Sequence, residues 1–268
     1  DARLLLEAVC GTDRNDLLVH GEQPVAPEAE EKYLNWIRQR AEHIPLQQLT
    51  GEQGFMGLTF SVNEHVLIPR QDTEILVEEV LKELHDGMRV LDMCTGSGCI
   101  LLSLLHYSND CEGLGVDLSA EALEVAGRNV LKVLTPEKAE HAHFLQSDLF
   151  EKVEGKFEII VSNPPYIASA EVEKLMPEVR DHEPRMALDG TEDGLYFYRR
   201  IIEEAGKHLV SSGMLFFEIG YDQGQAVSEL MRTEGYCDVQ VVQDYAGMDR
   251  VVFGTYVTVQ PAPFAKSR

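Results

Sequence analysis

The sequence predicts an α/β fold: a doubly wound, seven-stranded, mostly parallel sheet with a small N-terminal helical domain. The first observation is the alternation of strand-like and helix-like runs after Asp72, which is typical of parallel sheets covered on both faces. The second is the helical spacing of apolar residues near the start of the chain. The third is composition, since 44% of the 268 residues are hydrophobic, which is enough for a packed core.

The small helical domain is predicted at residues 1–48. Apolar residues such as Leu5 and Val9 recur at helical spacing, and the stretch "GEQPVAP" interrupts this pattern. Pro27 suits the first position of a following helix, because it lacks the N–H that would have no partner there. Residues 49–70 differ, since glycines stand among the apolar residues, and this predicts a short hairpin or linker.

Residues 71–260 are predicted to form the α/β domain, and residues 261–268 a loose tail. The last two strands, 238–244 and 250–257, are joined by a short loop containing Gly247, so they should pair antiparallel. The other predicted strands are 88–93, 113–118, one within 142–150, 157–166 and 213–220, and the predicted helices are 72–84, 96–106, 119–134, 194–209 and 224–235.

Two of these helices have candidate capping residues. Asp72 or Thr73 would cap the helix at 72–84, and Ser119 would cap the helix at 119–134, because their short polar side chains can accept from free backbone N–H groups.

The net charge of the chain limits the classes of partner that it is expected to bind. There are 46 acidic and 23 basic residues, and the net charge is −23. Non-specific nucleic-acid binding requires Lys and Arg to neutralise phosphates, so nucleic acid is not the expected main partner. No run reaches the ~18 apolar residues of a membrane helix, and no secretory signal is visible. We expect a monomeric cytoplasmic protein, or a mitochondrial one if the source is eukaryotic. The first residue is Asp1 and not Met, so the sequence leaves open whether residues precede it.

The five cysteines are scattered and form no CxxC pair. This pattern favours reduced, mostly buried thiols rather than disulfides. Because paired ligands are absent, no metal site is expected.

A glycine-rich loop, "CTGSG" at residues 94–98, follows the first predicted strand of the α/β domain. Gly96 and Gly98 allow unusual φ values and close approach of a ligand to the backbone. Ligands of open α/β sheets bind at the carboxyl ends of the strands, where this loop lies. The motif is weak alone, because a plain strand-to-helix turn also explains it and the third glycine of the dinucleotide fingerprint is absent.

Acidic residues follow the next two predicted strands. Asp117 could accept hydrogen bonds from both hydroxyls of a ribose, and Asp148 from an adenine amino group, although each could instead be a capping residue. Together with the glycine loop and Asp92, they describe a pocket for an adenosine without a diphosphate. S-adenosylmethionine fits this description, and its sulfonium cation suits an acidic pocket.

The stretch Asn163-Pro164-Pro165-Tyr166 ends the fourth predicted strand of the domain. The Asn amide offers both an acceptor and donors. The prolines lack N–H groups, so their carbonyls can remain free to face the pocket. These groups and the Tyr ring could hold a planar NH₂ group, and acceptors aimed at its N–H bonds would stabilise the charge that develops when the nitrogen is methylated. A simple turn is the alternative.

Together with "DMCTGSG", "VDLS" and "SDLF", the "NPPY" motif resembles those of class I S-adenosylmethionine-dependent amino-methyltransferases, which have a Rossmann-like fold. The stretches "LTGEQGFMGLTFSV", "LIPRQDTEILVE" and "EPRMALDGTEDGLYFYRRII" narrow the match. With these, nearly the whole chain resembles the release-factor glutamine N5-methyltransferases (PrmC/HemK). "IPRQDTE" combined with "NPPY" is highly specific, whereas "NPPY" alone is shared with adenine methyltransferases.

The resemblance implies methylation of the glutamine N5 in the Gly-Gly-Gln motif of class-1 peptide-chain release factors. It also implies that residues 1–48 help to bind the release factor. The residues expected at the cofactor are Cys94, Thr95, Gly96, Ser97, Gly98, Asp117, Leu118, Asp148, Leu149 and Asn163. Those expected at the substrate amide are Asn163, Pro164, Pro165 and Tyr166, with the four-residue motif as the catalytic element.

Two residues, Phe55 and Thr73, have two interpretations each, and Arg70 has one. Phe55 matches an aromatic that helps to sandwich the substrate side chain in this family, but it is equally suited to the core of the hairpin. Arg70 and Thr73 lie near the cofactor by analogy, whereas Thr73 is equally suited to start a helix.

Two positions depart from the family pattern. Cys94 stands where many members have glycine, so the loop is expected to keep a negative φ there. Leu149 stands where some members have Trp, which leaves less surface to stack on adenine.

Other functions compete with this one. A sibling enzyme that methylates a ribosomal-protein glutamine would share the motif. An adenine amino-methyltransferase would explain "NPPY" but neither the acidity nor "IPRQDTE". A non-catalytic module that binds translation factors would not need the intact glycine loop, Asp117 and Asn163. An NAD oxidoreductase would need a diphosphate fingerprint.

Overall fold

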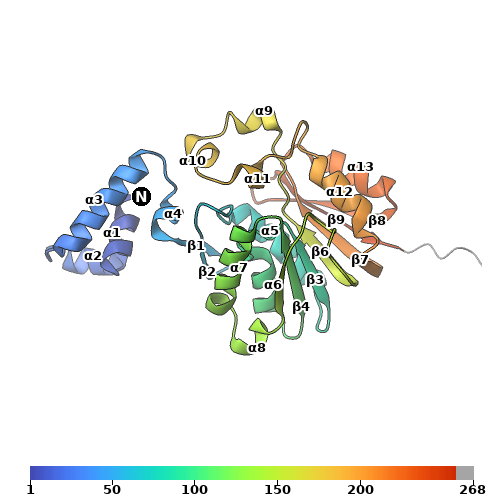
Figure 1. The fold of residues 1–268 in the computed structure, drawn as a ribbon, viewed down its shortest axis with the longest axis horizontal. Helices are drawn as coiled ribbons and strands as arrows, with labels where there is room; N and C mark the ends of the chain where they lie inside the picture. Colours follow the sequence, from blue (N-terminus) through green and yellow to red (C-terminus); the bar gives the residue numbers. More distant parts are fainter. Residues whose placement is uncertain (258–268) are drawn as a thin grey trace, which may run out of the picture.

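The structure, a computed structural model, describes residues 1–257, so the predicted tail at 261–268 lies outside the described residues. The chain begins with helices α1 (Ala2–Cys10), α2 (Arg14–His20), α3 (Pro27–Ala41) and α4 (Leu46–Thr50). The first three lie together at one end of the molecule (Figure 1). Pro27 occupies the start of α3, as predicted. Leu5 is the fully buried residue of α1, and this small unit exposes much of its remaining surface.

A hairpin connects these helices to the main domain. Strands β1 (Glu52–Phe55) and β2 (Leu58–Ser61) pair antiparallel, with Phe55 opposite Leu58, as the glycine-containing segment predicted. Asn129 anchors the hairpin: its amide accepts from the Ser61 N–H at 2.7 Å and donates to the Ser61 carbonyl at 3.0 Å and to the Ser97 carbonyl at 2.9 Å. One buried side chain therefore joins the hairpin to the glycine loop.

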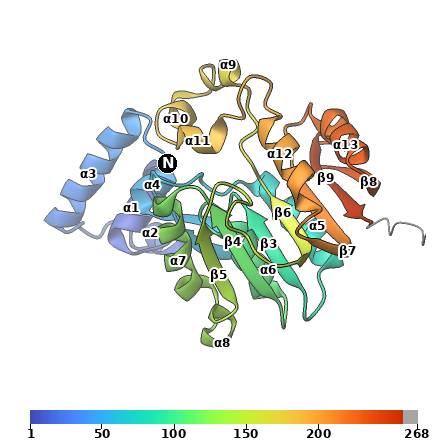
Figure 2. The same ribbon diagram turned by 45° about the vertical axis from the view of Figure 1, so that its right-hand side comes forward.

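The main sheet has seven strands in the order β5-β4-β3-β6-β7-β9-β8 (Figure 2). Strands β3 to β7 are parallel, and β9 pairs antiparallel with both β7 and β8. The chain moves outward from β3 through β5, returns to β6 and moves outward the other way, so the order switches between β3 and β6. The predicted fold class is confirmed. The strands are Arg89–Met93 (β3), Glu112–Asp117 (β4), Ala142–Gln146 (β5), Phe157–Ser162 (β6), Leu209–Glu218 (β7), Tyr236–Gln243 (β8) and Asp249–Tyr256 (β9).

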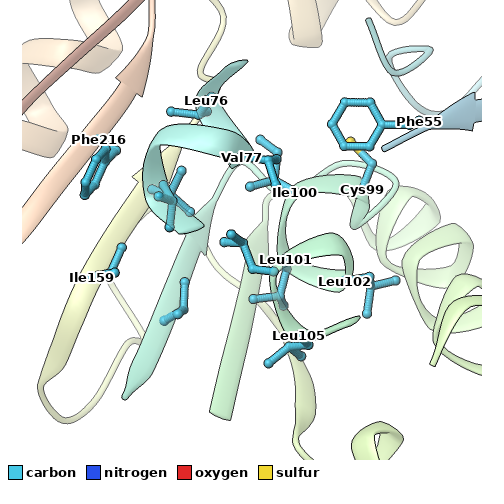
Figure 3. Packing of buried hydrophobic residues seen from close by; sticks show 14 of the residues in the cluster. Phe55, Leu76, Val77, Cys99, Ile100, Leu101, Leu102, Leu105, Ile159 and Phe216 are labelled. Carbon is cyan, nitrogen blue, oxygen red and sulfur yellow. The ribbon is translucent and has the colours of Figure 1, made fainter. Parts of the chain in front are cut away.

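Helices cover both faces of the sheet because alternate strand residues are apolar on both sides. In β6, Ile159 and Val161 belong to the buried cluster with helices α5 and α6, which Figure 3 shows, whereas Ile160 belongs to the cluster with α12 and α13. The main-domain helices are α5 (Gln71–Glu83), α6 (Cys99–Tyr107), α7 (Ala120–Val133), α8 (Pro136–Ala139), α12 (Tyr196–Ala205) and α13 (Gly224–Thr233).

The predicted caps have different outcomes. Ser119 caps α7, and its hydroxyl accepts from the Ala122 N–H at 3.0 Å, as predicted. The predicted cap of α5 is wrong: Arg70 holds the N-cap position without a side-chain cap bond, and Asp72 and Thr73 lie within the first turn. The reason is tertiary, because Asp72 pairs with the guanidinium of Arg250 at 3.3 Å and Thr73 meets Asn163.

The connection between β6 and α12 begins with the NPPY motif, and its remaining part, residues 167–195, contains the short helices α9 (Ser169–Val172), α10 (Pro177–Arg180) and α11 (Arg185–Leu188). It is bonded to the N-terminal helices: Arg40 of α3 pairs with Glu178 at 2.7 Å, and the Gln48 amide donates to the His182 carbonyl at 2.7 Å. The connection thus links the helical end of the molecule to the edge of the sheet where β6 ends (Figures 1 and 2).

All five cysteines are free thiols, but Cys10 and Cys237 are exposed, so the expectation of mostly buried thiols is only partly right. These two lie on the outer helix α1 and on the terminal strand β8, where one face of the element meets solvent. Among residues 1–257, no helix combines the length and apolarity needed to cross a membrane. The same part of the chain holds no cluster of three metal-ligating side chains.

Candidate active site

One pocket lies at the carboxyl ends of β3, β4, β5 and β6, around the switch in strand order. It collects residues that are far apart in the sequence. The predicted residues that line it are Arg70, Thr73, Cys94, Thr95, Gly96, Ser97, Asp117, Leu118, Asp148, Leu149, Asn163 and Pro165. Four others, Pro164, Tyr166, Phe55 and Gly98, are not among its lining residues; Gly98 ends the loop as the N-cap of α6.

The glycine loop has a fixed shape. Gly96 and Gly98 have φ values of 55° and 77°, and a Cβ on Gly98 would lie 3.2 Å from the Ala126 Cβ. The Thr95 hydroxyl donates to Asp92 at 2.6 Å, and the Thr95 N–H donates to the Val116 carbonyl at 2.9 Å. These bonds tie the loop to β3 and β4.

Cys94 corrects the sequence prediction. Its φ is 63°, in the left-handed region, although a negative φ was expected for a residue with a side chain. Such a conformation costs roughly 1–2 kcal/mol for an L-residue. It persists because the bonds of the next residue, Thr95, to Asp92 and Val116 fix the turn at the end of β3.

Asp92 lies beneath the loop and is fully buried. Its Oδ2 accepts from the Thr95 hydroxyl and, at 3.3 Å, from the Leu101 N–H, whereas Oδ1 has no partner among the described residues. Burial raises the pKa of Asp92 to about 7, against the effect of these hydrogen bonds. The carboxyl group therefore supports the loop from inside and does not face the pocket directly.

Asp117 is held by two backbone N–H groups. Its carboxylate accepts from Gly96 at 2.8 Å and from Ser119 at 2.9 Å. Burial nevertheless raises its pKa above the ordinary value. Each oxygen retains acceptor capacity at the pocket, because a carboxylate offers about four lone-pair sites. Leu118, the next residue, is 54% exposed at the rim.

Asp148 and Leu149 form the third part of this side. Asp148 pairs with Arg200 of α12 at 2.9 Å, a partner that the sequence reasoning missed. Leu149 is buried with a φ of 46°, so a turn follows β5 at this point. The ion pair fixes one carboxylate oxygen of Asp148, and the other remains free to accept from a ligand.

The NPPY motif forms the opposite side. Asn163 and Pro165 line the pocket, and the Asn163 amide donates to the Thr73 hydroxyl at 3.3 Å. Among the described residues, no group donates to the carbonyl of Pro164 or Pro165, in agreement with the predicted free carbonyls.

Tyr166 forms hydrogen bonds with Glu218 and Gln223. Its hydroxyl donates to Glu218 at 3.3 Å, and its carbonyl accepts from the Gln223 amide at 3.0 Å. Burial raises its pKa, and the nearby Glu218 carboxylate adds to this effect. Tyr166 is therefore a neutral phenol in this structure, with its hydroxyl used internally.

Of Phe55, Arg70 and Thr73, Phe55 lies in the core, whereas the other two line the pocket. Phe55 is 1% exposed and packs edge-to-face on Phe60, with ring centroids 6.0 Å apart, in the cluster that also contains Cys99 (Figure 3). Arg70 lines the pocket, and its guanidinium pairs with the buried Glu183 at 2.5 Å.

The connection at 167–195 supplies lining that sequence reasoning did not assign. Pro184, Met186, Ala187 and Asp189 all face the pocket. Two glycines allow the close approach: a Cβ on Gly190 would lie 2.8 Å from the Pro165 carbonyl, and one on Gly194 would collide with the Tyr166 carbonyl. The segment "GTEDGL" was noted only for its resemblance, but its glycines were the available signal.

Comparison with known proteins finds relatives that share one name. A release factor glutamine methyltransferase of Moorella thermoacetica is 44% identical over 254 residues, which cover 93% of this chain and 88% of the relative. That of Clostridium acetobutylicum is 42% identical over 256 residues, covering 94% and 89%. The chain belongs to the release factor glutamine methyltransferase family. Family models described as "PrmC N-terminal domain" and "Methyltransferase small domain" match residues 1–51 and 70–179.

The family membership confirms the resemblance drawn from the motifs. Among solved structures, a methyltransferase from Pyrococcus furiosus has a TM-score of 0.55 and 18% sequence identity, and the match covers 82% of this chain and 99% of that chain. At this identity the likeness concerns the fold alone, and it agrees with the methyltransferase fold of the sheet domain.

Proposed function

We propose that this chain transfers a methyl group from S-adenosylmethionine to the side-chain amide nitrogen of the glutamine in the Gly-Gly-Gln motif of peptide-chain release factors. The carrying observation is that Asn163 and Pro165 share one pocket with Asp117, Asp148 and the glycine loop. A cofactor site and an amide-binding motif thus face each other. The names of the family members support the substrate.

The residues present fit S-adenosylmethionine. Gly96 has open space where a Cβ would stand, so a ligand can approach its backbone closely. The lining contains Asp117, Asp148 and Asp189, an acidic set that suits a cation. When bound, this cofactor supplies a methyl group on a positively charged sulfur. Asp117 would accept from the ribose hydroxyls, and Asp148 and Leu149 would meet the adenine.

The NPPY side would orient the substrate. The Asn163 Oδ1 and the free carbonyl of Pro164 or Pro165 would accept from the two N–H bonds of the glutamine amide. The cofactor would supply the methyl group and keep the electron pair of its carbon–sulfur bond, the motif would hold the amide nitrogen toward that group, and the extra proton on nitrogen would pass to water. Acceptors aimed at the amide stabilise its developing positive charge.

A protein substrate is supported by the arrangement of the N-terminal helices. We propose that residues 1–48 form the docking unit, 49–70 the linker and 71–260 the catalytic domain. Through Arg40–Glu178 and Gln48–His182, the docking unit contacts the connection that also lines the pocket. Because the proposed substrate is a translation factor, we propose that the reaction occurs in the cytoplasm, or in the mitochondrion if the source is eukaryotic.

The test is methyl mapping. The protein is incubated with methyl-labelled S-adenosylmethionine and a purified release factor, and peptides are analysed by mass spectrometry. We expect one methyl group on the glutamine of Gly-Gly-Gln, and none on a Gln→Ala factor or on DNA. A label on another residue, on DNA, or on nothing would overturn the proposal.

A further inference from the structure

We propose that Arg200 is a positioning residue that makes the pocket selective for the amino group of adenine, because it fixes which atom of the Asp148 side chain faces the ligand. This inference rests on the proposed function, in which Asp148 meets the adenine. Asp148 lines the pocket after β5, and Arg200 belongs to α12, 52 residues further along the chain. Arg200 is not among the lining residues, so it would act through Asp148.

Helix α12 gives Arg200 a firm base beside the pocket. Tyr198 is fully buried beneath this helix, and its hydroxyl donates to the Glu218 carbonyl at 2.9 Å. Phe197, one turn before Arg200, lines the pocket. Because residues three apart lie on the same side of a helix, the side that reaches the pocket also carries the guanidinium toward Asp148.

The contact between the two side chains is a charge-assisted hydrogen bond. The Arg200 Nη1 donates to the Asp148 Oδ1 at 2.9 Å, and the guanidinium also lies 5.8 Å from the centre of the Tyr196 ring. Among residues 1–257, no donor bonds to the Asp148 Oδ2, which is the acceptor left for a ligand. Both partners of the ion pair are partly exposed, so the pair adds little stability. Its effect is on the direction of the carboxylate.

The chemistry of the two groups explains the selectivity. A guanidinium can only donate and an ionised carboxylate can only accept, so Arg200 takes Oδ1 and an acceptor remains for the pocket. The adenine amino group is a donor that matches this acceptor. A site that accepts from such a group discriminates against a ligand without it, because its own polar atom then lacks a partner.

An amide at position 148 would reveal the same constraint, because it has one accepting end and one donating end. In Asp148→Asn, Arg200 can bond only to the amide oxygen. The NH₂ end is then turned toward the pocket, where it opposes the amino group of adenine. Removal of Arg200 would free the amide to rotate and present its oxygen instead.

The first test is calorimetry with S-adenosylhomocysteine and with its analogue in which purine, without the amino group, replaces adenine. Neither probe carries the sulfonium charge, so loss of the Arg200 charge affects both alike. The Kd of the purine analogue should exceed that of S-adenosylhomocysteine by about tenfold in the wild type, as for a hydrogen bond to a partly exposed charged group. In Arg200→Met this ratio should fall to about threefold or less.

Two variants control this measurement. Arg200→Lys keeps a charged donor and should hold the ratio within about twofold of the wild-type value. Arg199→Met removes the neighbouring arginine of α12, which pairs with the exposed Asp193, and should leave the ratio unchanged. A wild-type ratio in Arg200→Met, or an equal fall in Arg199→Met, would overturn the proposal.

The second test reverses the sign of the effect. Asp148→Asn should bind S-adenosylhomocysteine no more tightly than the purine analogue. Adding Arg200→Met to this variant should strengthen S-adenosylhomocysteine binding by about threefold or more, whereas Arg200→Met alone weakens it. A merely structural role of Arg200 would weaken binding in both backgrounds, and that outcome would overturn the proposal. Thermal unfolding checks the double variant; if it does not fold, a preference for adenine retained in Asp148→Asn would overturn the proposal.

The same probes separate this inference from the proposed function. A wild type that binds S-adenosylhomocysteine with the expected selectivity but methylates no release factor would refute the proposed function, while the role of Arg200 would stand. Methylation of the release factor together with one ratio in all the variants would refute the role of Arg200 alone. A wild type that binds neither probe would overturn both.

Discussion

The two sides of the pocket are built in different ways. On the side of β3, β4 and β5, backbone N–H groups and acids form the surface: Asp117 accepts from the N–H groups of Gly96 and Ser119, which lie 21 and 2 residues from it. On the side of β6 and β7, the NPPY motif is held by buried side chains from distant segments. Thr73, Glu218 and Gln223 lie 90, 52 and 57 residues from the motif positions they contact.

This difference in construction corresponds to two tasks, cofactor binding and the chemical step. The cofactor side offers backbone and carboxylate groups that would bind ribose and adenine, so changes there should alter affinity. The motif side offers a few oriented acceptors whose effect grows as charge develops on nitrogen, so changes there should alter rate. Mutations on the two sides should therefore separate binding from chemistry.

The largest effect is expected from Asn163→Ala. It removes the proposed acceptor for the substrate amide, so kcat should fall by about two orders of magnitude or more. Cofactor affinity should change much less, because most cofactor contacts lie on the other side. Steady-state kinetics with a release factor at saturating cofactor measures this. Wild-type turnover in the variant would remove Asn163 from its assigned role.

Asp117→Ala should act in the opposite way. It removes the proposed ribose acceptor and releases the Gly96 and Ser119 N–H groups, so the Kd of S-adenosylmethionine should rise by roughly 10–100-fold. Calorimetry provides the measurement, with Glu121→Ala, an exposed acid at the start of α7, as the matched control. Unchanged affinity in Asp117→Ala would exclude it from the ribose site.

Asp92, which lies on the cofactor side, predicts a pH dependence of the free energy of unfolding. Its pKa rises from the ordinary 3.8 to about 7 in the fold. Between these values the folded state keeps a proton that the unfolded state has released, so stability is fullest below pH 4 and is lost as pH rises through 7. Relative to Asp92→Asn, the free energy of unfolding of the wild type should fall by more than ~1 kcal/mol over this window. Urea unfolding at several pH values would contradict this if the two curves ran parallel.

The smallest effect concerns the docking helices. Arg40→Ala breaks the ion pairs with Asp1 and Glu178, which join α3 to the chain start and to α10. Such pairs contribute about 1 kcal/mol or less, so the KM for a release factor should rise no more than about fivefold. The KM for a short Gly-Gly-Gln peptide should stay unchanged. Arg3→Ala, which breaks a pair within α1, serves as the control, and equal effects on factor and peptide would argue against docking.

The same contrast explains what could be predicted from the sequence. The sheet, the glycine loop and Ser119 as a cap depend on short-range patterns, and these predictions are confirmed. The cap of α5 was wrong because Asp72 and Thr73 are used by residues far along the chain. The negative φ expected at Cys94 was wrong because its conformation is imposed by bonds of its neighbour to two strands.

Only part of the motif side of the pocket could be predicted from the sequence. "NPPY" could be recognised, but Glu218 reads as the ordinary end of a strand and Gln223 as part of a loop. Their roles depend on tertiary contacts with Tyr166 that no local pattern encodes. The same holds for Arg200 at Asp148.

The division between the two sides is tested most directly by single-turnover methyl transfer to a release factor as a function of cofactor concentration. We expect the rate of Asp117→Ala to approach that of the wild type once S-adenosylmethionine exceeds its raised Kd. The rate of Asn163→Ala should remain about two orders of magnitude lower at every concentration. Recovery of Asn163→Ala by added cofactor, or a low plateau for Asp117→Ala, would contradict the account.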